Sequence, residues 1–170
     1  NGDYYTTTYD PNNHYEGDIL RIEKYDPEKV WTAALFDGDQ QGFPYLKRFL
    51  LERTSGARRN CFLNENPATR LLLLTDTTYP RFELVFGGAD AYRDPIIIEA
   101  DEFVTVKGFK AKGKRLTTNA VESIKELEPL RVPEADKAEA AASETETAPA
   151  DDQHPNEAEQ EAQDLFNQAD

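Results

Sequence analysis

The chain has 170 residues, of which 19 are Lys or Arg and 33 are Asp or Glu, and its formal net charge is −14. This length is sufficient for one ordinary domain, or for a smaller domain followed by a tail. The single cysteine, Cys61, excludes an internal disulfide and fits a reducing compartment, and no apolar run approaches the ~20 residues that a membrane span needs.

The chain up to residue 127 alternates between turns and short runs of β-branched, aromatic and aliphatic residues. Asp37-Gly38 begins a six-residue link between two such runs, which predicts a hairpin. The last run, Val121–Leu127, fits a strand, or a short helix because its apolar residues recur every three positions. The other expected strands are Tyr4–Tyr9, Ile19–Lys24, Val30–Phe36, Tyr45–Glu52, Arg70–Thr75, Phe82–Phe86, Ile96–Glu99 and Phe103–Lys107.

Several of these runs are apolar on both faces. Ile96–Ile98 has no polar position, and Val30–Phe36 places apolar side chains on both sides. Such strands lie in sheets that are covered on both faces, and the sequence contains no long helices to provide the cover. We therefore expect an all-β fold in which sheets cover sheets, as in a sandwich or in stacked propeller-like blades, with Trp31 in the core.

The basic segment Lys107–Arg115, KGFKAKGKR, is the strongest local signal in the chain. Its glycines permit tight turns, so its basic side chains can project together from one loop. The phosphates of a duplex would meet such a loop through charge-assisted contacts. The alternative is a solubilising turn that contacts nothing. The candidate DNA-binding residues of the basic segment are Lys107, Lys110, Lys112, Lys114 and Arg115.

A looser group of basic residues surrounds Ser55-Gly56 and spans a strand end and a loop. Its members are either further phosphate contacts or ordinary surface charges. Tyr45 and Phe49, in the same strand, belong to the core, because the alternation of a strand buries one of its faces. The candidate DNA-binding residues of this second group are Lys47, Arg48, Arg58 and Arg59.

Residues 134–170 form an acidic segment with 12 acidic residues and one Lys, whereas residues 1–133 contain 18 Lys and Arg against 21 Asp and Glu. Leu165 and Phe166 are its only large apolar side chains, so it cannot offset the entropy of becoming ordered. We therefore predict a folded domain over residues 1–132 and a disordered acidic tail over residues 133–170. The tail either competes with DNA for the basic residues of the domain or only keeps the protein soluble.

Catalytic chemistry finds little support in the sequence. His14 and His154 are the only histidines, and no Ser-His-Asp, metal-ligand or phosphate-loop pattern occurs. Cys61 has no His or Cys neighbour at metal-ligand spacing, which indicates a half-buried thiol. We therefore expect no catalytic residue, metal or cofactor in this chain. The rival classes are an enzyme domain with a cleft and a non-enzymatic β-rich module that binds protein or carbohydrate.

Four long stretches resemble, in this order, the distal part of the A subunit of bacterial type IIA topoisomerases, and topoisomerase IV most closely. They are YYTTTYDPNNHYEGDILRIEKYDPEKVWTAALFDGDQQGFPYLKRFLLE, LLLLTDTTYPRFELVFGG, EADEFVTVKGFKAKGKRLTT and ESIKELEPLR. Together they cover about residues 1–131. The chain begins at Asn1-Gly2-Asp3 without Met, so we expect it to be a fragment of such a subunit.

In that family, a breakage-reunion domain with a nucleophilic tyrosine precedes a C-terminal β-pinwheel, a propeller-like disc whose basic rim binds the transported duplex. The resemblance implies a partial β-pinwheel of about two to three blades. It also implies a non-enzymatic fragment of an ATP-hydrolysing DNA topoisomerase, an isomerase, with the catalytic tyrosine outside this chain. The fragment would guide the transported DNA during strand passage, decatenation and relaxation, and so act in chromosome segregation.

The alternative within the family is the C-terminal wrapping domain of gyrase A, which uses a glycine-rich basic box. Lys110–Leu116 (KAKGKRL) lies in a comparable setting but has one glycine and no glutamine, which favours the topoisomerase IV type of action. The implied partners are double-stranded DNA, the rest of the A subunit, the A-subunit dimer and the ATPase B subunit of an A2B2 enzyme. ATP and Mg²⁺ would bind to other domains or subunits. A cytoplasmic, nucleoid-associated location without a membrane partner follows from the same resemblance.

Overall fold

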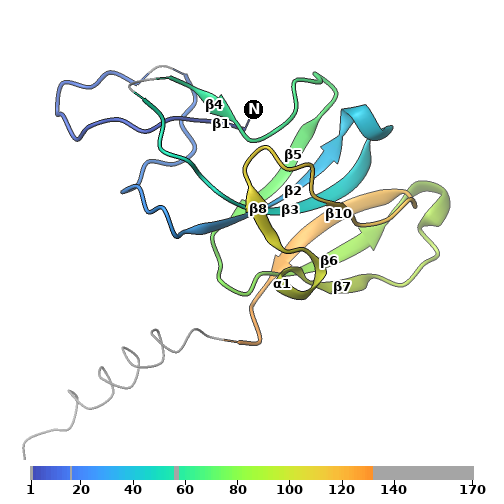
Figure 1. Ribbon diagram of the computed structural model, residues 1–170. Coiled ribbons are helices and arrows are strands. Elements are labelled where there is room, and N and C mark those ends of the chain that lie inside the picture. The colour runs from blue at the N-terminus through green and yellow to red at the C-terminus, as the bar shows by residue number, and fades with distance from the viewer. Residues whose placement is uncertain (1, 16, 56–57, 132–170) are drawn as a thin grey trace, which may run out of the picture. The chain divides into compact units, whose positions relative to one another are not determined.

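Strands dominate the computed structural model, which describes residues 2–15, 17–55 and 58–131 (Figure 1). The strands form three open sheets of five, three and two strands. Within the described residues the only α-helix, α1, is a single turn over Ala100–Phe103. The predicted mostly β fold is therefore confirmed. The predicted acidic tail, which includes His154, lies outside the described residues.

The largest sheet is built around a hairpin. β2 (Val30–Asp37) and β3 (Phe43–Leu50) pair antiparallel over their whole length, so the predicted hairpin is confirmed. Their link contains one 3-10 turn, η1 (Gly38–Gln40), in which the amide of Asp39 donates to Asp37 Oδ1 over 3.0 Å. The remaining strands of this sheet are β5 (Arg70–Thr75), paired with β2, and β8 (Val106–Gly108) and β9 (Lys114–Arg115), both paired with β3.

The two smaller sheets are antiparallel. Val121–Leu127 is a strand, β10, and not the alternative helix, because its backbone pairs along β6 from Phe86 to Arg81. A second 3-10 turn, η2 (Gly88–Asp90), follows β6. The three-stranded sheet has the order β10, β6 (Arg81–Phe86), β7 (Ile96–Glu99), and the two-stranded sheet pairs β1 (Asp3–Tyr4) with β4 (Asn60–Cys61).

The largest sheet is covered on both faces. Ala33 and Ala34 are adjacent in β2 and so point to opposite faces, yet both are fully buried. Ala34 packs in a cluster with residues of the three-stranded sheet, so one sheet covers another as expected. Ala33 packs in a second cluster, which includes Phe62 and Phe109 from outside both of these sheets. The first cluster also contains Leu46, Phe82, Leu84, Phe86 and Ile98, and the second contains Trp31, Phe49, Phe62 and Phe109.

Several expected strands differ from the observed ones. Ile19–Lys24 is not a strand, because no described segment pairs with it, and Leu20 is 85% exposed. Tyr4–Tyr9 is reduced to the end of β1, and Phe103–Lys107 is divided between α1 and β8. Ile96–Ile98 is not buried on both faces, because β7 is the edge strand of its sheet and exposes its first two residues.

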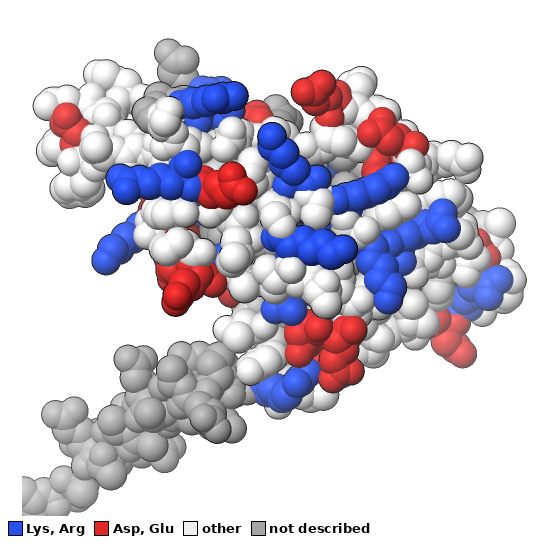
Figure 2. Space-filling view, viewed as in Figure 1, with Lys and Arg blue, Asp and Glu red and all other residues white. Residues whose placement is uncertain are grey.

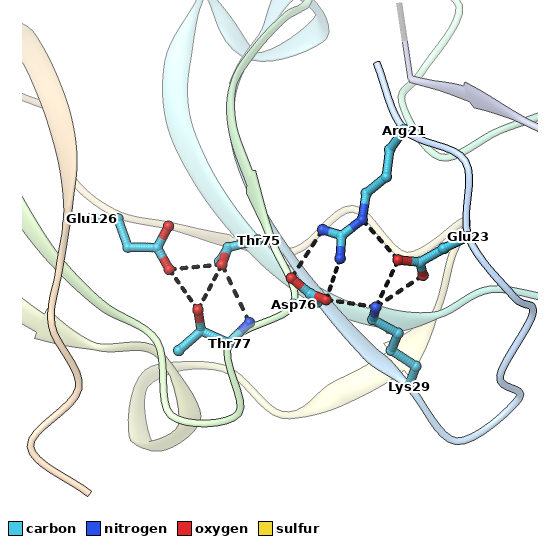
Figure 3. Close-up of polar contacts among 7 residues, drawn as sticks. All are labelled: Arg21, Glu23, Lys29, Thr75, Asp76, Thr77 and Glu126. Carbon is cyan, nitrogen blue, oxygen red and sulfur yellow. Dashed lines mark hydrogen bonds and ion pairs between the residues drawn. The ribbon is translucent and has the colours of Figure 1, made fainter. Parts of the chain in front are cut away.

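Four charged side chains attach the segment before β2 to the end of β5 (Figure 3). Arg21 donates to the Asp76 carboxylate from Nη1 over 3.0 Å and from Nη2 over 2.6 Å. Lys29 Nζ lies 2.5 Å from the same carboxylate and 2.9 Å from that of Glu23. Arg21 and Lys29 also lie 5.0 and 4.8 Å from the centre of the Trp31 ring. These contacts hold a segment that has no strand partner against the aromatic core.

A second polar group in Figure 3 connects the two larger sheets. Glu126 of β10 accepts hydrogen bonds from the hydroxyls of Thr75, over 2.7 Å, and Thr77, over 2.9 Å. Thr75 is the last residue of β5, so this carboxylate joins the edge strand of one sheet to the edge strand of the other.

Asp76→Asn is predicted to destabilise the protein at neutral pH and to lose this effect in acid. Hydrogen bonding from Arg21 is the main reason why the pKa of Asp76 is lowered from 3.8 to about 2. Such a carboxylate contributes stability above its unfolded-state pKa, and the contribution is lost as the pH falls through the folded-state value. We expect the free energy of unfolding to decrease by about 1 kcal/mol at pH 7, measured by urea denaturation, because the pair is partly exposed.

Asp18→Asn is the control, since Asp18 is an exposed carboxylate without a contact among the described residues. It should change stability little at any pH. Equal effects of the two substitutions, or an Asp76→Asn effect that does not decrease from about pH 5 to about pH 2, would contradict the assignment.

Candidate nucleic-acid interface

Both ends of the basic segment, residues 107–115, are hydrogen-bonded to a single strand. β8 runs parallel to β3, with Lys107 opposite Phe49, and β9 returns antiparallel, with Lys114 opposite Leu46. Lys47 is the residue of β3 between these two pairings. β3 therefore fixes the residues between β8 and β9 at both of their ends.

Lys47 lies beneath the basic segment and not at the surface. The residue is only 3% exposed, and its Nζ donates hydrogen bonds to the carbonyl oxygens of Phe62 and Phe109, each over 2.6 Å. The predicted DNA contact does not fit this position, because a buried ammonium that already binds two carbonyls is not accessible to a phosphate. The alternation of β3 predicts this burial, because Lys47 lies two residues from both Tyr45 and Phe49, the expected core residues, and so points to the same face of the sheet.

Two further residues determine the path of the basic segment. Phe109 is 3% exposed and packs edge-on against Tyr4, with 5.5 Å between the ring centres. Gly113 has a φ of +92°, and a Cβ at this position would lie 2.5 Å from the carbonyl oxygen of Leu46. Only a glycine fits so close to β3 in this conformation. The segment is therefore held by a buried ring on one side and by close backbone contact on the other.

The five predicted DNA-binding residues of the basic segment are all exposed. No ion pair within the described residues involves any of them. Four of them lie over aromatic rings, 4.2 to 5.8 Å from the ring centre. Figure 2 shows Lys and Arg side chains gathered over the middle of the viewed face, where Figure 1 places β8. The four pairs are Lys110 with Phe109, Lys112 with Tyr45, Lys114 with Phe103, and Arg115 with Phe43.

The second predicted group is not brought together as a set. Arg58 and Arg59 are exposed and precede β4. Arg48 is half-buried, and its Nη2 donates to the carbonyl oxygen of Thr78 over 3.4 Å. Its Nε is shielded from solvent and has no hydrogen-bond partner among the described residues. Burial lowers the pKa of Arg48, while Asp101 acts in the opposite direction.

A cavity of about 310 Å³ lies between β3 and the basic segment. It brings Arg48 together with Lys107 and Lys114, whereas Arg58 and Arg59 do not line it. Among the described residues, no Asp or Glu lines it. No local pattern in the sequence predicts this cavity, because its wall is assembled from β3, the end of α1 and both ends of the basic segment.

The chemistry that this site offers is electrostatic, because charged donors are presented on a fixed loop. The described part of the chain has no group of three or more His, Cys, Asp or Glu side chains arranged to hold a metal ion. None of the helices described here has the length and hydropathy of a membrane span. Cys61 is half-buried, as predicted, and burial raises the pKa of its thiol.

These observations define a class of protein, a mostly β domain that presents a fixed loop of cations without carboxylate partners in the described part of the chain. Residues 1–128 match the family model described as Topoisomerase C-terminal domain, Bacteroidota. The chain therefore belongs to the family of topoisomerase C-terminal domains of the Bacteroidota. Comparisons with curated proteins and with solved structures gave no match. A topoisomerase acts on DNA, so membership of this family implies an association with DNA.

Lys47 is predicted to make the protein more stable as the pH rises from about 8 to about 10. Burial lowers the pKa of Lys47 from 10.5 to about 8, against the opposite effect of Cys61. Between these values the unfolded chain binds more protons at this site than the folded chain, so the free energy of unfolding increases with pH. Lys47→Met lacks this titration. The stability difference between the wild type and Lys47→Met should therefore grow in favour of the wild type, by at most about 1.4 kcal/mol per pH unit.

Urea denaturation at several pH values measures this difference, and Lys24→Met is the matched control. Lys24 is exposed, so its difference from the wild type should stay constant over the same pH range. A constant difference for Lys47→Met as well would show that Lys47 is not buried in the folded protein.

Gly113→Ala is predicted to destabilise the protein by more than about 1 kcal/mol, because alanine is strained at this positive φ and its Cβ meets the Leu46 carbonyl. Gly108→Ala is a control within the same basic segment, since a Cβ at Gly108 has no neighbour within 4 Å. We expect it to change stability by about 0.5 kcal/mol or less. Thermal or urea denaturation compares the two variants, and equal stabilities would contradict the close contact with β3.

Proposed function

We propose that this chain is the DNA-binding C-terminal region of a type IIA topoisomerase A subunit of the topoisomerase IV kind. Its basic segment contacts the backbone of duplex DNA and guides the transported DNA during ATP-dependent strand passage. Decatenation and relaxation by the whole enzyme would then serve chromosome segregation. Family membership supports the association with DNA, and the basic segment supports the place of contact.

This proposal rests on the exposure of the five cations of the basic segment and on their lack of carboxylate partners among the described residues. They have no carboxylate partners among the described residues, so their charge is not neutralised locally. Pairing with phosphates would release counterions from the duplex, which gives favourable and salt-dependent binding. The described residues contain no helix long enough to enter a groove, so the contacts are with the backbone and not with bases.

Two further parts of the proposal, the β-pinwheel fold and the topoisomerase IV type, are supported by the packing of the sheets and by the resemblance of the sequence. We assign the three open sheets to a partial β-pinwheel, and the packing of one sheet on another supports this assignment. The single glycine and missing glutamine of Lys110–Leu116 support topoisomerase IV over a gyrase that wraps DNA.

The proposed partners and location are those of the whole enzyme. The nucleophilic tyrosine, ATP and Mg²⁺ belong to other domains or subunits of an A2B2 enzyme, in which this chain joins the A-subunit dimer and the ATPase B subunit. The enzyme acts in the cytoplasm, on the nucleoid. The chain itself contributes binding and orientation of duplex DNA.

A module that binds carbohydrate or protein would present exposed aromatic rings beside its polar groups. At the basic segment the rings lie beneath the cations, and Tyr45 and Phe109 are only 6% and 3% exposed. The strongly exposed rings, Tyr9 and Tyr92, lie outside the strands and outside the basic segment. The arrangement therefore favours contact with a polyanion.

Replacing Lys107, Lys110, Lys112, Lys114 and Arg115 with Ala is predicted to weaken duplex binding and to flatten its salt dependence. Each lost phosphate contact removes about 0.9 from the slope of log K against log salt concentration. Gel shifts of linear and supercoiled duplex at several salt concentrations measure this slope. An unchanged slope would exclude the basic segment from the contact.

A pair of double variants with equal charge change controls for net charge. Lys110→Ala with Lys112→Ala removes two cations from the basic segment, and Lys24→Ala with Lys125→Ala removes two exposed cations elsewhere. Only the first pair should lower the slope, by about 1.8 when both residues contact phosphates. Equal losses for the two pairs would show that general charge, and not this segment, determines binding.

A further inference from the structure

The cavity between β3 and the basic segment has the chemistry of an anion site. Its volume of about 310 Å³ is at the lower end of the range for small-ligand sites, about 300–1,000 Å³. Arg48, Lys107 and Lys114 line it, and the part of the chain that the structure describes contributes no carboxylate to its lining. Lys47 lies in the same wall, but its Nζ is engaged by two carbonyl oxygens.

The guanidinium of Arg48 has more donors than the protein satisfies. Within the described residues its only hydrogen bond is the long one from Nη2 to Thr78, at 3.4 Å, and its Nε is shielded from water without an acceptor. A guanidinium has five N–H donors, and a buried donor without a partner is unfavourable. Because Nε is shielded, an anion in the cavity would bind the terminal Nη donors of Arg48, of which the described residues engage only Nη2, over 3.4 Å.

The other two cations retain donors as well. Lys114 Nζ lies 4.2 Å from the centre of the Phe103 ring and donates to the Phe103 carbonyl oxygen over 3.2 Å, which uses one of its three donors. Lys107 is exposed, and no hydrogen bond or ion pair occupies its ammonium in the described part of the chain. Both side chains can therefore bind a further acceptor.

One carboxylate near the cavity, that of Asp101, opposes anion binding and is only partly engaged, because its Oδ1 is buried without a hydrogen-bond partner among the described residues. Asp101 acts on Arg48 electrostatically, and its Oδ2 accepts a hydrogen bond from Arg131 over 2.9 Å. Glu102 contacts the same guanidinium over 3.3 Å. Arg131 carries one positive charge and offsets one of these two carboxylates. Neither carboxylate lines the cavity, whose described lining residues include three cations that can bind an anion.

We propose that this cavity is a phosphate-binding site, with Arg48, Lys107 and Lys114 as its cationic ligands, and that one phosphodiester of duplex DNA occupies it. The inference rests on the proposed function and adds to it the place where a backbone phosphate is bound most deeply. The exposed ammonium groups of Lys110 and Lys112 then contact the phosphates on either side of this one.

The guanidinium of Arg48 provides a direct readout. In ¹H–¹⁵N spectra of the 170-residue chain, its Nε–Hε signal is identified by its loss in Arg48→Lys. We expect this signal to shift when duplex DNA is added. Arg48→Gln should weaken duplex binding about tenfold, which corresponds to one charge-assisted hydrogen bond, and should lower the salt slope by about 0.9.

Lys107→Gln tests the same cavity from an exposed position, in case Arg48→Gln affects folding, and Lys24→Gln is the matched control. Lys107→Gln should also lower the slope by about 0.9, while Lys24→Gln should leave it unchanged. An Arg48 signal that stays in place while the duplex binds, together with unchanged slopes for Arg48→Gln and Lys107→Gln, would overturn the inference and leave the proposed function standing.

Inorganic phosphate, added in place of the duplex, distinguishes the source of the phosphate. A shift of the Arg48 signal with both additions supports a site that any phosphate can enter. A shift with the duplex alone supports a site for the phosphodiester backbone. A shift with inorganic phosphate alone would overturn the assignment to DNA. Absence of duplex binding by the wild type contradicts the proposed function, and the inorganic phosphate result then decides the cavity separately.

Discussion

The two hydrogen bonds of the buried Lys47 ammonium are the interaction on which the rest of the interface depends. They join β3 to the carbonyl of Phe62, after β4, and to that of Phe109, within the basic segment. A buried charge is unfavourable unless it is hydrogen-bonded, so the folded state requires both carbonyls to remain in place. β8 and β9 pair with β3 on either side of Lys47, and the path of the basic segment follows from these three contacts.

The same contacts explain how an acidic protein presents a cationic surface. The net charge of −14 comes mainly from residues 134–170, whereas the basic segment holds five exposed cations that lack carboxylate partners among the described residues. Aromatic rings beneath four of these cations restrict them without neutralising them. Local arrangement, and not total charge, therefore determines the electrostatic character of this face.

Packing on both faces of the largest sheet places the interface at its edge. The three-stranded sheet covers the face of Ala34, and Phe62 and Phe109 cover the face of Ala33. The short strands β8 and β9 pair with β3 along one edge of this sheet. The basic segment fits this edge, because Phe109 is buried in the core while the cations remain in solvent. Arg48 of β3 lines the cavity together with both ends of this segment.

Alternation, turn residues and local charge are short-range properties, and they predict the hairpin, β5, β6, β7, the mostly β class and the exposed cations of Lys107–Arg115. The apolar spacing of Val121–Leu127 fits a strand or a helix, and pairing with β6 makes it the strand β10. The internal position of Lys47 and the placement of Arg48 beside Lys107 and Lys114 are evident only in the folded chain. The same holds for Ile19–Lys24, which has no strand partner among the described residues. The physical reason is that burial, strand partners and cavities depend on residues distant in the chain, which no local pattern specifies.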